Sequence, residues 1–190
     1  MVMSEKTDEE IASLVQQGDI ESFGILVERY EQKLLRCARK FIFDGEEAKD
    51  HVQESFIKAY VNIQSFDSSR KFSSWMYRIA HNECVNAVKK KGREPLSYFD
   101  LDVFFPHLVA KETADDDANK NDLKRILDQT LEKLSPKYRE PLVLYYYEDM
   151  DYKEIAEILQ IPVSTVGVRL QRGKDFLKKL VTEVDQTYGK

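Results

Sequence analysis

The stretch DYKEIAEILQIPVSTVGVRLQRGKDFL, residues 151–177, decides the fold of the C-terminal part of the chain. Its first four residues place a glutamate three positions after an aspartate, which is the capping-box pattern that begins a helix. A short turn over residues 160–162 follows, and apolar residues then return at helical spacing. Two helices joined by so short a turn predict a helix-turn-helix, whose second helix lies in a DNA groove.

The second helix of this motif has two different sides. Its predicted core-facing arc consists of Val166, Leu170, Gly173, Leu177 and Leu180. We expect this arc to pack against the preceding helix through Ile155, Ala156, Leu159 and Ile161. The outer side, which is predicted to face DNA, carries Ser164, Gly167, Val168, Gln171, Arg172 and Lys174.

Gly167 lies inside this outer side, although glycine costs roughly 1 kcal/mol against alanine in a helix interior. Because Gly167 is off the core-facing arc, helix packing does not explain it. A glycine there either lets DNA approach closely or removes a contact that a longer side chain would make. A tolerated surface substitution explains it equally well. The neighbouring Val168 can contact a thymine methyl group.

The composition is that of a globular helical protein. Of the 190 residues, 42% are hydrophobic and 33% are charged, whereas only 7 are glycine and 5 are proline. Cys37 and Cys84 stand far apart in no metal-ligand pattern, so both are expected to be buried thiols in a reducing compartment. No run of about 18 apolar residues is present, and the N-terminus is acidic, unlike a signal peptide. The sequence therefore predicts an all-α protein of the cytoplasm without a metal or cofactor.

Helix signals follow one another along the first half of the chain. Asp19 is expected to cap a helix whose apolar positions continue towards Leu34, and Asp44 begins a second helix. Residues 65–74 are predicted to form a polar loop. A long helix follows this loop and ends at Gly92.

The helical pattern fails between the two halves. Residues 94–122 combine two prolines, the apolar patch YFDLDVFF and the acidic run ETADDDANKND, which predicts an extended linker. Within this run, ADDD is better explained as solvated charge than as a metal site. We therefore predict two small helical domains, residues 1–95 and 123–190, joined by a flexible acidic linker over residues 96–122.

The second domain is predicted to begin with a helix over residues 123–134. Ser135 and Pro136 then supply an N-cap and a first-turn proline for the next helix. Pro141 falls near the second turn of that helix, where it removes one backbone hydrogen bond and is expected to kink or delay the helix.

The net charge of −5 conceals two basic regions in an acidic background. Residues 70–93 carry a net charge of +6 and residues 164–190 carry +3, whereas residues 94–122 carry −6. In the first basic region, cations and amides recur at spacings of three or four residues. This polar stripe consists of Arg78, Asn82, Asn86, Lys89 and Arg93.

The stripe has a nucleic-acid interpretation and a plain one. Arginine and lysine bind backbone phosphates, and an asparagine amide can pair with a base edge. The preceding loop, FDSSRKFSSW, supplies hydroxyls, cations and aromatic rings, a combination that can hold an unstacked base. A solvated helix face explains the stripe alone equally well, and Trp75 fits the core better than a DNA contact.

These segments together resemble the extracytoplasmic-function (ECF) group of bacterial sigma factors, the promoter-recognition subunits of RNA polymerase. The resemblance rests on the order of four segments and covers nearly the whole chain except the linker. They are GDIESFGILVERY, AKDHVQESFIKAYVNIQSFD, KFSSWMYRIAHNECVNAVKK and LSPKYREPLVLYYYEDMDYKEIAEILQIPVSTVGVRLQRGKDFLKKL. It implies core RNA polymerase and promoter DNA as partners, with an anti-sigma factor that holds the two domains together.

The resemblance also implies a role for particular residues. The docking surface for the largest polymerase subunit would include Asp50, Gln53, Glu54 and Phe56. The loop and helix that melt and read the minus-ten element would supply Ser68, Arg70, Lys71, Phe72, Ser73, Trp75, Arg78, Asn82, Asn86, Lys89 and Arg93. The helix that reads the minus-thirty-five element would supply Ser164, Thr165, Gly167, Val168, Arg169, Gln171, Arg172 and Lys174.

The sequence departs from the family pattern at four positions. The family usually has lysine or arginine where this chain has Gly167, and a small polar residue where it has Val168. Gln160 replaces a common turn glycine, and Pro141 interrupts a helix that is usually uninterrupted. The minus-thirty-five sequence preference therefore cannot be carried over from the family.

Three other classes of protein remain as alternatives. A stand-alone helix-turn-helix regulator usually carries an N-terminal domain of alternating strands and helices, whereas residues 1–93 look helical throughout. An enzyme is disfavoured because His51, His81 and His107 are scattered, with no activated nucleophile and no Gly-rich phosphate loop. A helical adaptor that does not bind DNA would leave both basic regions unexplained.

Overall fold

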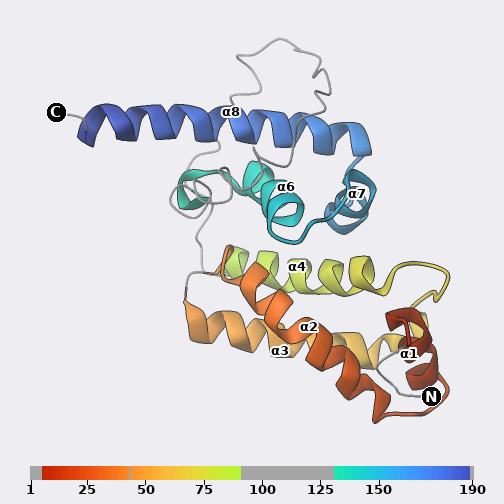
Figure 1. The fold of residues 1–190 in the computed structure, drawn as a ribbon. Coiled ribbons are helices and arrows are strands. Elements are labelled where there is room, and N and C mark those ends of the chain that lie inside the picture. Colours follow the sequence, from red (N-terminus) through yellow and green to blue (C-terminus); the bar gives the residue numbers. More distant parts are fainter. Residues whose placement is uncertain (1–5, 43, 91–130, 189–190) are drawn as a thin grey trace. The chain divides into compact units, whose positions relative to one another are not determined.

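The computed structural model describes residues 6–42, 44–90 and 131–188, and the secondary structure in these ranges is entirely helical. The chain divides into two compact units, with the boundary after Gly92. We describe each unit by itself (Figure 1). The predicted linker, Arg93 and His107 lie outside the described residues.

The N-terminal unit is a helical bundle. Its elements are α1 (Asp8–Gln16), α2 (Ser22–Ala38), α3 (Gly45–Val61), the 3-10 turn η2 (Ile63–Ser65) and α4 (Phe72–Lys90). Helices α2, α3 and α4 pack on one another, and α1 packs on α2 and α4. The sequence did not predict α1. Its start is a capping box, in which Thr7 Oγ1 accepts from the Glu10 N–H and Glu10 Oε2 accepts from the Thr7 N–H.

The other helix starts in this unit follow the sequence in part. Asp44 caps α3 as predicted, since its Oδ1 accepts from the N–H groups of Glu46 and Glu47. The N-cap of α2 is Glu21 rather than the predicted Asp19, although Asp19 accepts hydrogen bonds from the backbone and hydroxyl of Ser22, where α2 begins. The predicted start of the long helix after residue 74 is wrong, because α4 already begins at Phe72.

The core of the N-terminal unit contains a cluster of aromatic rings. The Phe72 ring lies 5.3 Å from the Phe66 ring, 5.6 Å from the Trp75 ring and 5.5 Å from the Tyr30 ring, measured between centroids. Edge-to-face and tilted pairs at these distances are favourable beyond the area that they bury. This cluster anchors the start of α4 and the preceding loop to α2.

Asp8 ties α1 to α2 beside this cluster. It accepts hydrogen bonds from the Tyr30 hydroxyl and, at 2.6 Å, from Arg29 Nη1. Burial raises the pKa of Tyr30 far above its usual range, and the hydrogen bond to Asp8 raises it further. Tyr30 is therefore a neutral hydrogen-bond donor in the core.

The C-terminal unit consists of η4 (Leu131–Lys133), α6 (Pro136–Tyr146), α7 (Tyr152–Leu159) and α8 (Val163–Tyr188). The helix predicted over residues 123–134 lies mostly outside the described residues, and residues 131–133 form one 3-10 turn instead. Pro136 occupies the first turn of α6 as predicted, but the Ser135 side chain makes no capping hydrogen bond. The predicted delay of the helix at Pro141 is wrong, because α6 begins at Pro136 and continues through Pro141 to Tyr146.

The predicted helix-turn-helix is confirmed. Asp151 and Glu154 form the capping box at the start of α7, with both reciprocal hydrogen bonds at 2.9 Å. Gln160 ends α7 in the left-handed region, at φ 55° and ψ 45°, where glycine is normally favoured. After residues 161 and 162, α8 begins at Val163.

The core of the C-terminal unit differs from the prediction in one respect. The predicted arc of α8 is buried at Val166, Leu170, Gly173 and Leu177. It packs mainly along α6 rather than α7. From α7, Ile155 and Ile158 are buried, whereas the predicted contacts Ala156, Leu159 and Ile161 are only half-buried.

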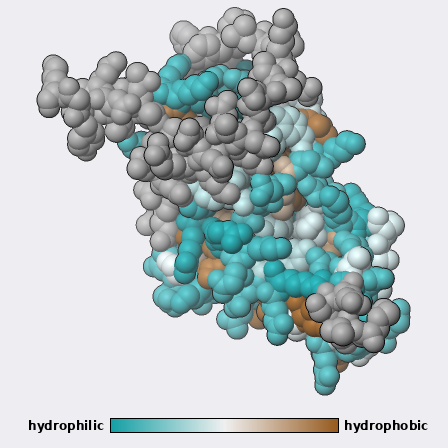
Figure 2. Space-filling view, viewed as in Figure 1, coloured by the Kyte–Doolittle hydropathy of each residue, from teal (hydrophilic) through white to brown (hydrophobic). Residues whose placement is uncertain are grey.

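The described surface is mainly polar. On the face drawn in Figure 2, hydrophilic residues cover most of the described surface and hydrophobic ones form small patches. Cys37 and Cys84 are both buried, as predicted. Among the described helices, none is long and apolar enough to cross a membrane.

Candidate polymerase and nucleic-acid interfaces

The loop between η2 and α4 displays hydroxyls and cations from an ordered turn. Asp67 Oδ1 accepts hydrogen bonds from the Ser69 hydroxyl at 2.7 Å and from the Ser69 N–H at 3.0 Å. These two bonds, from the side chain first, lower the pKa of the Asp67 carboxyl. The turn closes with a bond from the Arg70 N–H to the Asp67 carbonyl. Ser68, Arg70 and Lys71 are all exposed around it.

The polar stripe on α4 continues from this loop. Asn82 and Asn86 are exposed, and Arg78, one turn earlier, is half-buried. Residues four positions apart lie on one face of a helix, so the three side chains form one polar surface. Lys89 belongs to the same helix, but its side chain and all of Arg93 lie outside the described part. This surface joins a guanidinium group to two amides that can bond bases or phosphates.

Two aromatic residues predicted to contact the minus-ten element are in the core instead. Phe72 is 1% exposed and Trp75 is 9% exposed, and both rings pack on Phe66. The early start of α4 explains this, because it places both residues on the inward side of the first helical turn. Trp75 is therefore a core residue, as its place on the helix led us to expect, and Phe72 is one too, while Ser73 is half-buried.

The outer side of α8 forms a second polar surface. Ser164 is exposed, and Val168 is 42% exposed. The other candidates for the minus-thirty-five element are half-buried: Thr165, Gly167, Arg169, Gln171, Arg172 and Lys174. Gln171 Nε2 donates to Asp175 Oδ1 at 3.2 Å, one turn further along. None of these eight residues is buried in the core.

Gly167 has a neighbour that the sequence did not reveal. A Cβ at this position would lie 3.5 Å from Cε2 of Tyr152, which is an ordinary van der Waals contact. The backbone of α8 therefore accepts a side chain here without strain. Packing does not require Gly167, in agreement with its predicted place off the core-facing arc.

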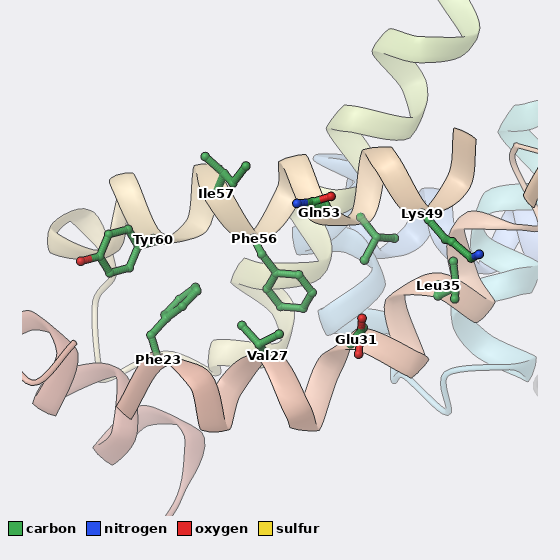
Figure 3. A pocket seen from close by; sticks show the side chains of 10 residues that line it. Phe23, Val27, Glu31, Leu35, Lys49, Gln53, Phe56, Ile57 and Tyr60 are labelled. Atoms are coloured by element: carbon green, nitrogen blue, oxygen red, sulfur yellow. The ribbon is translucent and has the colours of Figure 1, made fainter. Parts of the chain in front are cut away.

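A groove of about 600 Å³ runs between α2 and α3 (Figure 3). Its lining consists of Phe23, Val27, Glu31 and Leu35 from α2 with Lys49, Val52, Gln53, Phe56, Ile57 and Tyr60 from α3. The Phe56 ring points between the two helices, and the Phe23 and Tyr60 rings lie together towards one end. Their centroids are 5.2 Å apart, in an edge-to-face arrangement.

Two of the four candidate polymerase contacts, Gln53 and Phe56, line this groove. Asp50, Gln53 and Glu54 are exposed on α3, but Phe56 is 8% exposed and forms part of the groove wall. The sequence prediction missed Ile57, which is 51% exposed on the same helix. A single exposed apolar residue is no signal of a protein contact, so the sequence could not identify Ile57; its place beside Phe56 and Tyr60 in the groove lining does.

The two histidines of the described residues, His51 and His81, lie on different helices. On α3, His51 Nε2 lies 3.9 Å from Glu47 Oε1. On α4, the His81 ring packs edge-on against Phe41, with 6.2 Å between the ring centroids. Across residues 6–42, 44–90 and 131–188, no three histidine, cysteine, aspartate or glutamate side chains gather as a metal site would require.

Comparison with known proteins matches both units to parts of one family. The family model for Sigma-70 region 2 matches residues 26–94, and the model for Sigma-70, region 4 matches residues 124–177. The ECF RNA polymerase sigma factor SigW of Bacillus subtilis (strain 168) is 38% identical over 178 residues. These residues cover 90% of this chain and 94% of that protein.

Two solved structures show a similar fold. CnrH, solved in complex with the cytosolic domain of CnrY, is 28% identical with a TM-score of 0.69, over 94% of this chain and 99% of that chain. The sigma factor RpoE from Bartonella quintana, solved in complex with the anti-sigma factor NepR, is 25% identical. Its TM-score is 0.61, over 85% of this chain and 98% of that chain.

Proposed function

This chain belongs to the ECF group of RNA polymerase sigma factors, and we propose which part of promoter recognition each of its two units performs. The observation that carries the proposal is that regions 2 and 4 of the family match the two units in order. The chain directs core RNA polymerase to specific promoters and assists melting of the minus-ten element. The stand-alone regulator is not favoured, because the N-terminal unit matches region 2.

The N-terminal unit binds the polymerase through α3 and the groove beside it. Exposed Asp50, Gln53 and Glu54 supply polar contacts, and Ile57 supplies an apolar one. An apolar centre with a polar rim is the usual composition of a protein interface. Phe56 acts by shaping the groove wall, since little of its ring is exposed.

The loop before α4 and the stripe on α4 bind the minus-ten element. Arg70, Lys71 and Arg78 hold backbone phosphates, which gives affinity without sequence preference. Asn82 and Asn86 contact base edges or the backbone of the melted strand. Lys89 and Arg93 are assigned to the same contact by their sequence spacing alone. Ser68 and Ser73 add hydroxyls around the loop.

The outer side of α8 binds the minus-thirty-five element in the major groove. Arg169, Arg172 and Lys174 supply cations, and Val168 is exposed enough to contact a thymine methyl group. Ser164, Thr165 and Gln171 supply hydrogen-bonding groups. Gly167 lacks the side chain with which the family usually contacts DNA at this position. Recognition of the DNA sequence therefore shifts to the neighbouring residues of α8.

The similarity of this chain to two proteins that were solved in complexes supports an inhibitory partner for it. RpoE of Bartonella quintana was solved with an anti-sigma factor, and CnrH with the cytosolic domain of CnrY. We propose that this chain also has an anti-sigma factor and works in the cytoplasm with the polymerase. It is not an enzyme itself, because the polymerase performs the chemistry of RNA synthesis.

Run-off transcription tests the proposal. Core polymerase from the source organism would be mixed with this chain and a genomic promoter library, and transcript starts would be mapped. We expect discrete starts that require the chain and share upstream sequences. If core polymerase neither binds the chain nor gains promoter preference from it, the proposed function fails and a stand-alone regulator becomes the better explanation.

A further inference from the structure

Helix α1 holds one end of the loop that precedes α4. Gln16, the last residue of α1, donates from Nε2 to the carbonyl oxygens of Ile63 at 2.7 Å and Phe66 at 2.8 Å. Gln64 returns a bond of 2.9 Å from its Nε2 to the Gln16 carbonyl. One glutamine side chain thus fixes the backbone on both sides of the point where η2 ends and the loop begins.

The same helix holds the other end of the loop. Glu9 Oε1 accepts a hydrogen bond of 2.9 Å from the Phe72 N–H, at the first residue of α4. The first N–H groups of a helix have no acceptor within the helix, and a carboxylate is favoured beside them. Lys71, which precedes Phe72, has no acceptor in its side chain, so Glu9 supplies from α1 the cap that the local sequence lacks.

Between these two anchors the loop is fixed by its own turn. Asp67 accepts from Ser69 and Arg70 as described above. The exposed cations Arg70 and Lys71 therefore project from a backbone that is held at its start, middle and end. A binding loop that is already ordered loses less conformational entropy when it binds its ligand.

The polar contacts of Gln16 and Glu9 are separate from the apolar contacts that attach α1 to the rest of the unit. The apolar side of α1 is already buried through Ile11, Ala12 and Val15. The polar contacts of Gln16 and Glu9, by contrast, go to backbone atoms at the two ends of one loop. The match to Sigma-70 region 2 begins only at residue 26, so α1 lies outside it.

We infer that Gln16 and Glu9 are positioning residues for minus-ten recognition, which hold the loop in the geometry that the melted strand meets. This inference rests on the proposed role of the loop in binding that strand. Neither residue touches DNA itself. Removing their hydrogen bonds should loosen the loop and weaken binding of the strand, while the polymerase-binding groove and α8 stay intact.

The test compares Gln16→Met with Gln17→Met in assembled holoenzyme. Methionine keeps the length of glutamine but removes the donor, and Gln17 is an exposed neighbour whose replacement leaves both loop anchors in place. The probe is a single-stranded oligonucleotide carrying the non-template minus-ten sequence found by run-off mapping. We expect Gln16→Met to weaken its binding about tenfold, and Gln17→Met to change it by less than about twofold.

Two further measurements separate positioning from general stability. The affinity of the Gln16→Met chain for core polymerase should equal that of the unmodified chain. Glu9→Gln, which keeps an acceptor oxygen, should retain more oligonucleotide affinity than Glu9→Ala.

The inference is overturned if Gln16→Met leaves oligonucleotide binding unchanged, or lowers it only in proportion to core binding. If holoenzyme with the unmodified chain does not bind the oligonucleotide, the proposed function of the loop itself fails, and the inference fails with it.

Discussion

Gly173 on α8 lies directly against Leu142 on α6. A Cβ at residue 173 would be 2.7 Å from Cδ1 of Leu142, closer than real Cβ atoms come to a neighbour, and 3.2 Å from its Cγ, which is tighter than most such contacts. Leu142 is fully buried, so its side chain has little space to move aside. The close packing of α6 on α8, which positions the outer side of α8, therefore requires a residue without a side chain at 173.

We predict that Gly173→Ala destabilises the C-terminal unit. Overpacking a core costs about 1–3 kcal/mol, and the better helix propensity of alanine returns only about 1 kcal/mol. The net loss should appear as faster hydrogen–deuterium exchange of the backbone amides in α6 and α8. Exchange in α2 and α3 of the other unit serves as an internal reference.

Gly167→Ala is the matched control on the same helix. Its new methyl group would meet Tyr152 Cε2 at an ordinary 3.5 Å, so only the propensity gain of up to about 1 kcal/mol remains. Exchange in α8 should therefore slow in this variant. If Gly167→Ala and Gly173→Ala change amide exchange in α8 equally, contact with Leu142 does not determine the effect of a methyl group at residue 173.

A lysine at residue 167 should strengthen binding to the minus-thirty-five element. The new cation would stand beside exposed Val168 on the side of α8 that we propose faces DNA, and each phosphate contact releases about one counterion. Holoenzyme with Gly167→Lys should bind promoter DNA more tightly, with a salt dependence steeper by about one ion. This is measured by titration at several salt concentrations.

Gly24→Lys supplies the control for this charge change. Gly24 lies on α2 with open space around its Cβ position, so a lysine fits there without strain. The substitution adds the same charge to the other unit. If both variants gain affinity equally, the effect is general attraction to DNA, and the orientation proposed for α8 is wrong.

Binding to core polymerase should depend on Ile57. This residue is 51% exposed on the groove, so Ile57→Asp should change the free energy of unfolding by less than about 0.5 kcal/mol. A carboxylate desolvated in an interface is costly, and we expect core affinity to fall at least about tenfold. Val163→Asp, an exposed apolar-to-acid change at the start of α8, is the comparison. Titration of labelled chain with core polymerase gives both values, and unchanged affinity for Ile57→Asp would place the docking surface elsewhere.

Local sequence signals predicted helix starts only where the capping group is local. Asp44 and the Asp151–Glu154 pair cap the helices that they precede, and the sequence identified both. The same local signal stands at Thr7 and Glu10, where the sequence prediction missed helix α1. The start of α4 could not be predicted in this way, since the acceptor for the Phe72 N–H is Glu9, which is 63 residues earlier.

The aromatic and glycine positions show a second limit of sequence reasoning. An aromatic ring beside cations suits both base stacking and core packing. Helix periodicity favours the core for Trp75, whereas only burial in the structure identifies Phe72 as a core residue. The sequence places Gly173 on the core-facing arc of α8 and Gly167 off it, but it does not show which side chains lie opposite them. Their roles differ through the side chains opposite them, Tyr152 and Leu142, which come from other helices.

The ordered turn at Asp67 should be visible in the titration of that carboxyl group. Hydrogen bonds from Ser69 lower its pKa below the ordinary value, so the folded loop favours the ionised form. The turn is therefore stabilised above the ordinary pKa of an aspartate, and this contribution is lost as the pH falls through the lowered pKa. Carbon-detected NMR of the side-chain carboxyl groups measures the value directly.

Ser69→Ala removes the hydroxyl donor, which is the larger cause of the shift, and leaves the backbone donor in place. The pKa of Asp67 should therefore rise part of the way towards its ordinary value. Ser68→Ala keeps both Ser69 donors, and we expect it to leave the pKa unchanged. If Asp67 already titrates normally in the unmodified chain, the turn is not held by these bonds in solution. In that case the ordered loop would depend on Gln16 and Glu9 alone.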